Sequence, residues 1–104
     1  MMNHPETIAM NTAAPFELGR IVATPNLIES LEARGLHALL RTAIHRHALG
    51  DWGDVSAEDA QANTDALKHH DRLFSVYKVD DDLTIWIITE ADRSVTTALL
   101  PEDY

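Results

Sequence analysis

The densest group of side chains able to do chemistry lies in one short segment. His47 is followed within eight residues by Asp51, Trp52 and Asp54, and two glycines in the same stretch favour a loop. A carboxylate that accepts a hydrogen bond from an imidazole orients the ring and raises its basicity, which suits a general base. His47, Asp51 and Asp54 are therefore candidate catalytic residues of a small hydrolase, although no serine or cysteine stands beside them as a nucleophile.

The same segment also fits a purely structural role. In that interpretation Trp52 fills the core, and Gly50 and Gly53 shape the turns. Asp51 and Asp54 then accept hydrogen bonds from nearby backbone N–H groups, as aspartates in turns commonly do. The sequence leaves both interpretations open.

Two acidic turns are candidates for contact with another protein. One is a run of three aspartates, and the other combines two acids with an arginine that is expected to pair with either of them. The aspartates lack the alternating spacing of a calcium loop, so a solvated turn is expected. The candidate partner-binding residues are Asp80, Asp81, Asp82, Glu90, Asp92, Arg93 and the neighbouring Tyr77.

No metal or cofactor is expected. The chain has no cysteine, and it lacks a P-loop, a Rossmann glycine pattern, a zinc-protease signature and a nucleophile elbow. His69 and His70 adjoin Asp71, which indicates exposed polar side chains more than a metal site.

The elements that must position these residues follow from capping signals and apolar periodicity. Thr24 before Pro25 is typical of a helix start, and so is Ser56 followed by Asp59. Gly19 inside the first strand indicates a bulge or a close backbone approach. We expect strands over 16–23, 73–79, 83–89 and 95–100, and helices over 25–34, 36–48 and 56–69. The order β-α-α-α-β-β-β predicts an α+β domain with a small antiparallel sheet and short helices packed on one face.

Both faces of this sheet are predicted to be apolar. If Val79 pairs with Leu83 across a three-residue turn, alternation assigns each side chain to a face. One face gathers Phe74, Val76, Trp86, Ile88, Val95, Thr97 and Leu99. The other gathers Leu73, Tyr77, Val79, Leu83, Ile85, Ile87 and Ala98. Three short helices are not expected to cover both faces, so either the N-terminal tail or another chain, such as a second copy in a homodimer, would cover the second.

Composition favours one acidic domain. Residues 1–14 lack periodicity and are expected to form a mobile tail before a single domain at 15–104. No run resembles a membrane helix or a secretion signal, which favours the cytoplasm and no membrane contact. The net charge of -9 disfavours direct nucleic-acid binding. Residues 50–104 hold thirteen acids and four bases, whereas residues 1–49 hold four of each. This segregation favours a partner with a basic surface.

Several motifs resemble a family of short proteins carried on plasmids and integrative elements. These proteins are often labelled plasmid-related proteins or subunit M of type I restriction enzymes. The similar stretches span about residues 16–104 and are LGRIVATP (18–25), His47, GDWGD (50–54), Asp59, Asn63, Ala66-Leu67, IWIITEADRS (85–94) and LLPEDY (99–104). The usual Asp-Gly hairpin turn is replaced by three aspartates, which is expected to alter turn geometry more than function. The chain has no Asn-Pro-Pro-Tyr-like methyltransferase motif. The resemblance therefore implies a setting, mobile elements that compete with host defence, and does not imply a particular reaction.

Two functional hypotheses follow. The favoured one is an accessory protein that binds a basic surface on a host or phage protein. In its counter-defence form it would be an anti-restriction or anti-CRISPR-like inhibitor, with DNA mimicry as the extreme case. The alternative is a small hydrolase, or a protein with a RelE/ParE-like toxin fold, that uses His47, Asp51 and Asp54. The element order supports that alternative only by analogy, and the acidic charge argues against RNA cleavage. A regulatory, antitoxin-like role is a third possibility.

Overall fold

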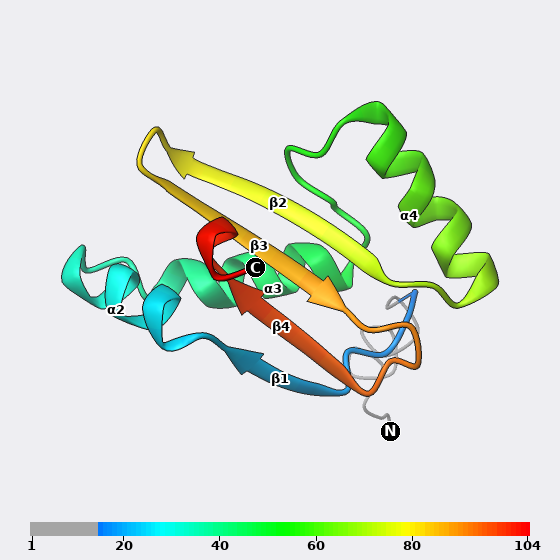
Figure 1. The fold of residues 1–104 in the computed structure, drawn as a ribbon, viewed down its shortest axis with the longest axis horizontal. Helices are drawn as coiled ribbons and strands as arrows, with labels where there is room; N and C mark the ends of the chain where they lie inside the picture. Colours follow the sequence, from blue (N-terminus) through cyan, green and yellow to red (C-terminus); the bar gives the residue numbers. More distant parts are fainter. Residues whose placement is uncertain (1–14) are drawn as a thin grey trace, which may run out of the picture.

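Three helices and a four-stranded sheet make up the fold in a computed structural model that describes residues 15–104 (Figure 1). The expected tail at 1–14 lies outside the described residues. The elements are β1 (Arg20–Ala23), α2 (Pro25–Ala33), α3 (Ala38–Ala48), α4 (Ala57–His69), β2 (Leu73–Asp80), β3 (Leu83–Thr89), β4 (Val95–Leu99) and the 3-10 helix η1 (Pro101–Asp103). The predicted α+β class and element order are confirmed.

The sheet is mixed, so the prediction of an antiparallel sheet was wrong for one strand. The strand order is β1-β4-β3-β2, and β1 runs parallel to β4 while the other pairs are antiparallel. All three helices lie between β1 and β4 in the sequence, which is a connection long enough for parallel pairing. β1 is also shorter than predicted. Gly19 precedes it with φ +66°, and a Cβ there would overlap the backbone of Arg93 and Ser94, so the close approach expected at this glycine is confirmed.

The hairpin between β2 and β3 keeps the predicted faces with a different turn. Phe74 pairs with Ile88, and Val76 pairs with Trp86, as the alternation predicts. Asp80, however, pairs with Leu83, and the register shifts between Lys78 and Asp80. The turn is therefore two residues long and follows a β-bulge, instead of three residues long. The Asp80 carboxylate stabilises it by accepting the backbone N–H of Asp82 at 2.8 Å.

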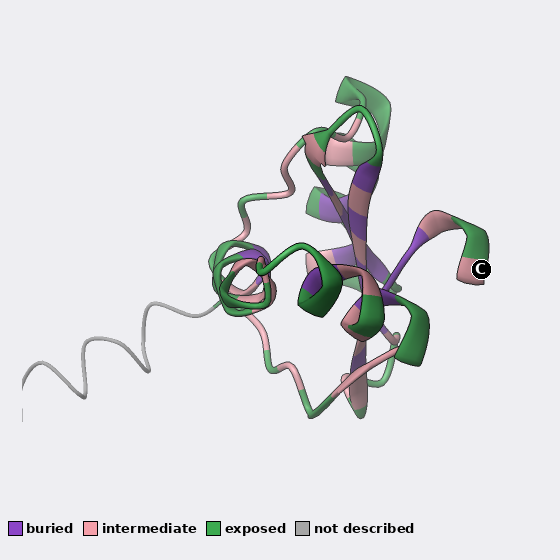
Figure 2. Cartoon of the chain, turned by 90° about the vertical axis from the view of Figure 1, so that its left-hand side faces the viewer, coloured by how far each residue is buried: buried purple, intermediate pink, exposed green. Residues whose placement is uncertain are grey.

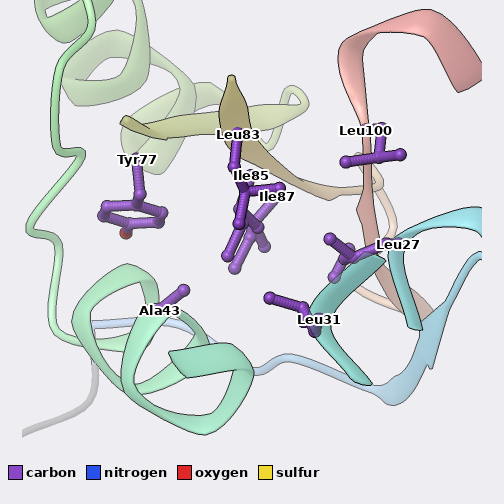
Figure 3. Close-up of a cluster of buried hydrophobic side chains, with 9 residues drawn as sticks. Leu27, Leu31, Ala43, Tyr77, Leu83, Ile85, Ile87 and Leu100 are labelled. Carbon is purple, nitrogen blue, oxygen red and sulfur yellow. The ribbon is translucent and has the colours of Figure 1, made fainter. Parts of the chain in front are cut away.

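The main core lies between one face of the sheet and helices α2 and α3. Thr24 begins α2 by accepting the N–H of Leu27 at 3.3 Å, with Pro25 in the first turn, so the predicted cap is confirmed. The buried cluster combines both helices with the sheet and consists of Leu27, Leu31, Ala43, Tyr77, Leu83, Ile85, Ile87, Ala98 and Leu100 (Figure 3). In Figure 2, α3 and the C-terminal segment lie on opposite sides of the sheet.

The outer edge of β2 is covered by α4 and by the segment before it (Figure 1). The Asn63 amide donates to the Phe74 carbonyl at 2.7 Å and accepts the Phe74 N–H at 3.0 Å. Further along the strand, Gly53 forms a parallel bridge with Val76, and the Asp54 carboxylate accepts the N–H of Lys78 at 2.8 Å. Paired edge groups do not recruit another strand, so this edge is closed to β-sheet addition.

We expect Asn63→Ala to lower the free energy of unfolding by about 2 kcal/mol, because both Phe74 backbone groups lose their partner. Gln61→Ala on the exposed side of the same helix is the matched control, and we expect a loss below about 0.5 kcal/mol from it. Urea titration of both variants measures the difference. Equal stabilities would show that the Asn63 amide does not hold this edge.

Candidate functional site

The two carboxylates of the candidate catalytic loop do not contact His47. The Asp51 carboxylate binds Arg46, with Oδ2 2.6 Å from Nε, and it also accepts the N–H of Gly53. The hydrogen bond from Arg46 lowers the pKa of Asp51 below its usual value. The Asp54 carboxylate accepts the backbone N–H of Lys78 at the edge of β2. The expected assembly of His47, Asp51 and Asp54 is therefore not formed, because each carboxylate is held by a nearer donor.

His47 instead joins a buried chain of hydroxyl groups. It is fully buried, with Nδ1 2.6 Å from Ser75 Oγ and Nε2 2.8 Å from Thr89 Oγ1. Thr89 contacts Thr96, which donates to the Leu18 carbonyl at 2.7 Å. A carbonyl only accepts, so Thr96 donates to Leu18 and must itself accept from the Thr89 hydroxyl. Thr89 then accepts from the imidazole, which is protonated on Nε2, and the Ser75 hydroxyl donates to Nδ1.

This series of hydrogen bonds stabilises the fold and is poorly placed for catalysis. Burial lowers the pKa of His47 from 6.5 to about 4, which keeps the ring neutral near pH 7. Phe16 and Trp52 pack against the ring with centroids 5.4 and 5.7 Å away. Ser75 is fully buried as well, so no substrate reaches the serine–histidine pair. Sequence reasoning missed Ser75, although a serine between Leu73 and Tyr77 on an apolar face was a usable signal.

The candidate partner-binding residues fall at two opposite ends of the sheet. The aspartate turn is at the β2–β3 end, where Asp80 forms an ion pair with Arg34 of α2. Glu90 and Asp92 are in the β3–β4 turn at the other end of β3. Tyr77, by contrast, is buried and donates to the Asp51 carbonyl at 2.6 Å. These residues therefore do not form one patch.

Arg93 does not pair with either neighbouring acid, contrary to expectation. Its guanidinium donates to backbone carbonyls, with the shortest bond, 2.7 Å, to Asp71 and others to Ala66 and Glu90. The side chain thereby connects the end of α4 to the β3–β4 turn. Glu90 pairs instead with Arg72, with Oε1 3.2 Å from Nε.

An aromatic pocket lies on the sheet face opposite α3. It has a volume of about 240 Å³ and is lined by Arg72, Leu73, Phe74, Trp86, Ile88 and Tyr104. The Phe74 and Trp86 rings meet edge to face at 5.0 Å, and Tyr104 packs on Trp86 at 5.9 Å. The face predicted to need a cover is thus partly covered by the C-terminal segment, which leaves this opening. The alternation of apolar residues in the sequence predicted that this face is apolar. The position of Tyr104 against Trp86 could not be predicted from the sequence.

Three basic side chains are distributed over this face. Arg72 borders the pocket, and its Nη1 donates to the Tyr104 hydroxyl at 3.1 Å. The register places Arg20 opposite Val95 and Lys78 opposite Thr84, which puts both on the same face as Trp86. Glu90 pairs with Arg72, and the C-terminal segment on this side of the sheet carries two more acids, Glu102 and Asp103. Arg72 is therefore the cation that borders the pocket itself.

Comparison with family models, with curated proteins and with solved structures gave no match. Within residues 15–104, no helix is long and apolar enough to cross a bilayer. In the same range, no three histidine or carboxylate side chains are grouped closely enough to hold a metal ion.

Proposed function

We propose that this protein is a small protein-binding module that receives an apolar side chain of its partner in the aromatic pocket. The observation that carries the proposal is the pocket itself, walled by Phe74, Trp86 and Tyr104 and about 240 Å³ in volume. That volume suits one large side chain. In many protein interfaces, a few anchor side chains buried in such pockets contribute most of the binding free energy.

The acidic surplus supports a protein partner that also carries basic groups. Asp82 and Glu102 border a hollow between α2 and the hairpin, and Asp81 stands at the hairpin tip. Exposed carboxylates at this end would steer a basic surface towards the module, mainly by raising the association rate. A host or phage protein with such a surface is the proposed partner, in the cytoplasm.

The resemblance to plasmid-borne proteins supports a counter-defence setting, in which the partner belongs to a restriction or CRISPR-like system. The DNA-mimic version has less support. Asp54, Asp92 and Asp103 each accept a backbone N–H, which is a local structural role. The proposal therefore depends on the pocket and does not require regular rows of carboxylates.

The test is affinity capture from host extract with a matched pair of variants. Tyr104 is 71% exposed, so Tyr104→Ala removes a pocket wall without opening the core. Leu49→Ala removes a 50%-exposed apolar side chain outside the pocket and is the control. We expect one protein to be retained by the wild type and by Leu49→Ala, with retention by Tyr104→Ala reduced roughly tenfold.

Sedimentation of the purified protein completes this test. Equal retention by both variants would contradict the proposal, and so would capture of nucleic acid in place of protein. A wild-type dimer that dissociates in Tyr104→Ala would contradict it as well, because a second copy would then occupy the face.

A further inference from the structure

We infer that the partner segment in the aromatic pocket carries a carboxylate beside its aromatic or aliphatic side chain. This inference rests on the proposed function and names the chemistry of the bound segment. It differs from the sequence-based expectation, which considered only basic groups on the partner. A basic group would suit the acidic hairpin end, whereas the pocket end needs an acid.

The charge around the pocket carries the argument. Arg72 is 48% exposed, and its Nε and Nη1 atoms face Glu90 and Tyr104. Its Nη2 atom has no acceptor among residues 15–104, so a carboxylate could bind there without displacing Glu90. Arg20 and Lys78 are on the same face but on its two outer strands, β1 and β2, so Arg72 is the cation at the pocket.

The pocket floor complements this cationic border. Phe74 and Ile88 contribute apolar surface, and the Trp86 ring presents an aromatic wall. An aromatic or branched side chain would be held by these groups, while a neighbouring carboxylate reached the guanidinium of Arg72. Only a segment that carries both the apolar side chain and the carboxylate contacts the apolar floor and the guanidinium of Arg72 at the same time.

A peptide fits better than a single-stranded nucleic acid, although aromatic side chains and bases also occur together at RNA-binding sheets. The whole protein carries a charge of -9, which opposes the approach of a polyanion. The pocket has a volume of about 240 Å³, which accommodates one ring and not a series of stacked bases. A short peptide brings one ring and few charges.

The experiment uses blocked pentapeptides and the amide spectrum of the ¹⁵N-labelled protein. The peptides are Gly-Asp-Phe-Asp-Gly, its amide analogue Gly-Asn-Phe-Asn-Gly, and Gly-Asp-Ala-Asp-Gly without the anchor. The chain has two tryptophans. The Trp86 indole N–H reports the pocket, and the Trp52 indole, stacked on Phe16, is the internal control.

We expect the acidic phenylalanine peptide to move the Trp86 signal and to bind roughly three- to fivefold more tightly than its amide analogue. The alanine peptide should leave the signal in place. Arg72→Gln should remove the preference for the acidic peptide, while Arg41→Gln on α3, which removes the same charge from a distant exposed site, should retain it.

Equal affinities for the acidic and amide peptides would overturn the inference, and so would no shift with any peptide. A short oligothymidine that moves the Trp86 signal at lower concentration than the peptides would overturn it too. These outcomes are separable from failure of the proposed function, which depends on Tyr104 in the capture experiment.

Discussion

Lowering the pH from 7 to 4 is expected to reduce the free energy of unfolding by about 3 kcal/mol through His47 alone. Burial holds the pKa of this imidazole at about 4, against 6.5 in the unfolded chain. The unfolded state therefore binds the extra proton first. The stabilisation is complete above pH 6.5 and is lost progressively as the pH falls to 4.

The measurement is urea unfolding at several pH values between 4 and 7. His47→Gln removes the titrating group, so we expect this variant to show a flat profile between about pH 5 and 7 and to be less stable than the wild type at pH 7 by about 2 kcal/mol. The lowered pKa values of Asp51, Asp80, Asp92 and Asp103 begin to reduce stability below about pH 5, since their usual value is 3.8. A wild-type profile that stays flat between pH 4 and 6.5 would show that His47 is not buried as a neutral ring.

Gly53→Ala is expected to destabilise the protein by about 4 kcal/mol. Gly53 has φ +74°, and an added Cβ would overlap the Val76 carbonyl and the Tyr77 ring. The substitution would also push the GDWGD segment away from the edge of β2. Both the backbone conformation and the close approach therefore require glycine at this position.

Gly35→Ala separates these two causes. Gly35 also has positive φ, +66°, but an added Cβ would meet nothing within 4 Å. We expect this control to lose only about 1 kcal/mol, the cost of the left-handed conformation alone. Thermal and urea unfolding of the two variants should differ by roughly 3 kcal/mol. Similar losses would mean that the segment moves freely away from β2.

The local signals in the sequence were reliable because they act over a few residues. Ser56 caps α4 by accepting the N–H of Asp59 at 3.1 Å, as predicted. Alternation correctly placed Phe74 and Trp86 on one face of the sheet, because the two-residue period of a strand is independent of what covers it. The bulge at the hairpin altered the turn but not the faces.

The candidate sites were less predictable because they depend on competition between distant groups. His47 was expected to meet Asp51, which is near in sequence, but its partners Ser75 and Thr89 lie 28 and 42 residues away. Asp51 had a closer charged donor in Arg46. A neutral imidazole between hydroxyl groups also avoids the cost of burying an ion pair.

The sequence by itself determined the α+β class, the element order, the helix caps, the two apolar sheet faces and the acidic second half of the chain. These properties depend on residue type, periodicity and charge within short windows. The tertiary structure alone decided that β1 runs parallel to β4, that the turn acids lie at opposite ends of the sheet, and that Tyr104 forms a pocket with Trp86. Such features follow from which surfaces meet when the chain folds, and several arrangements satisfy the same local pattern until packing selects one.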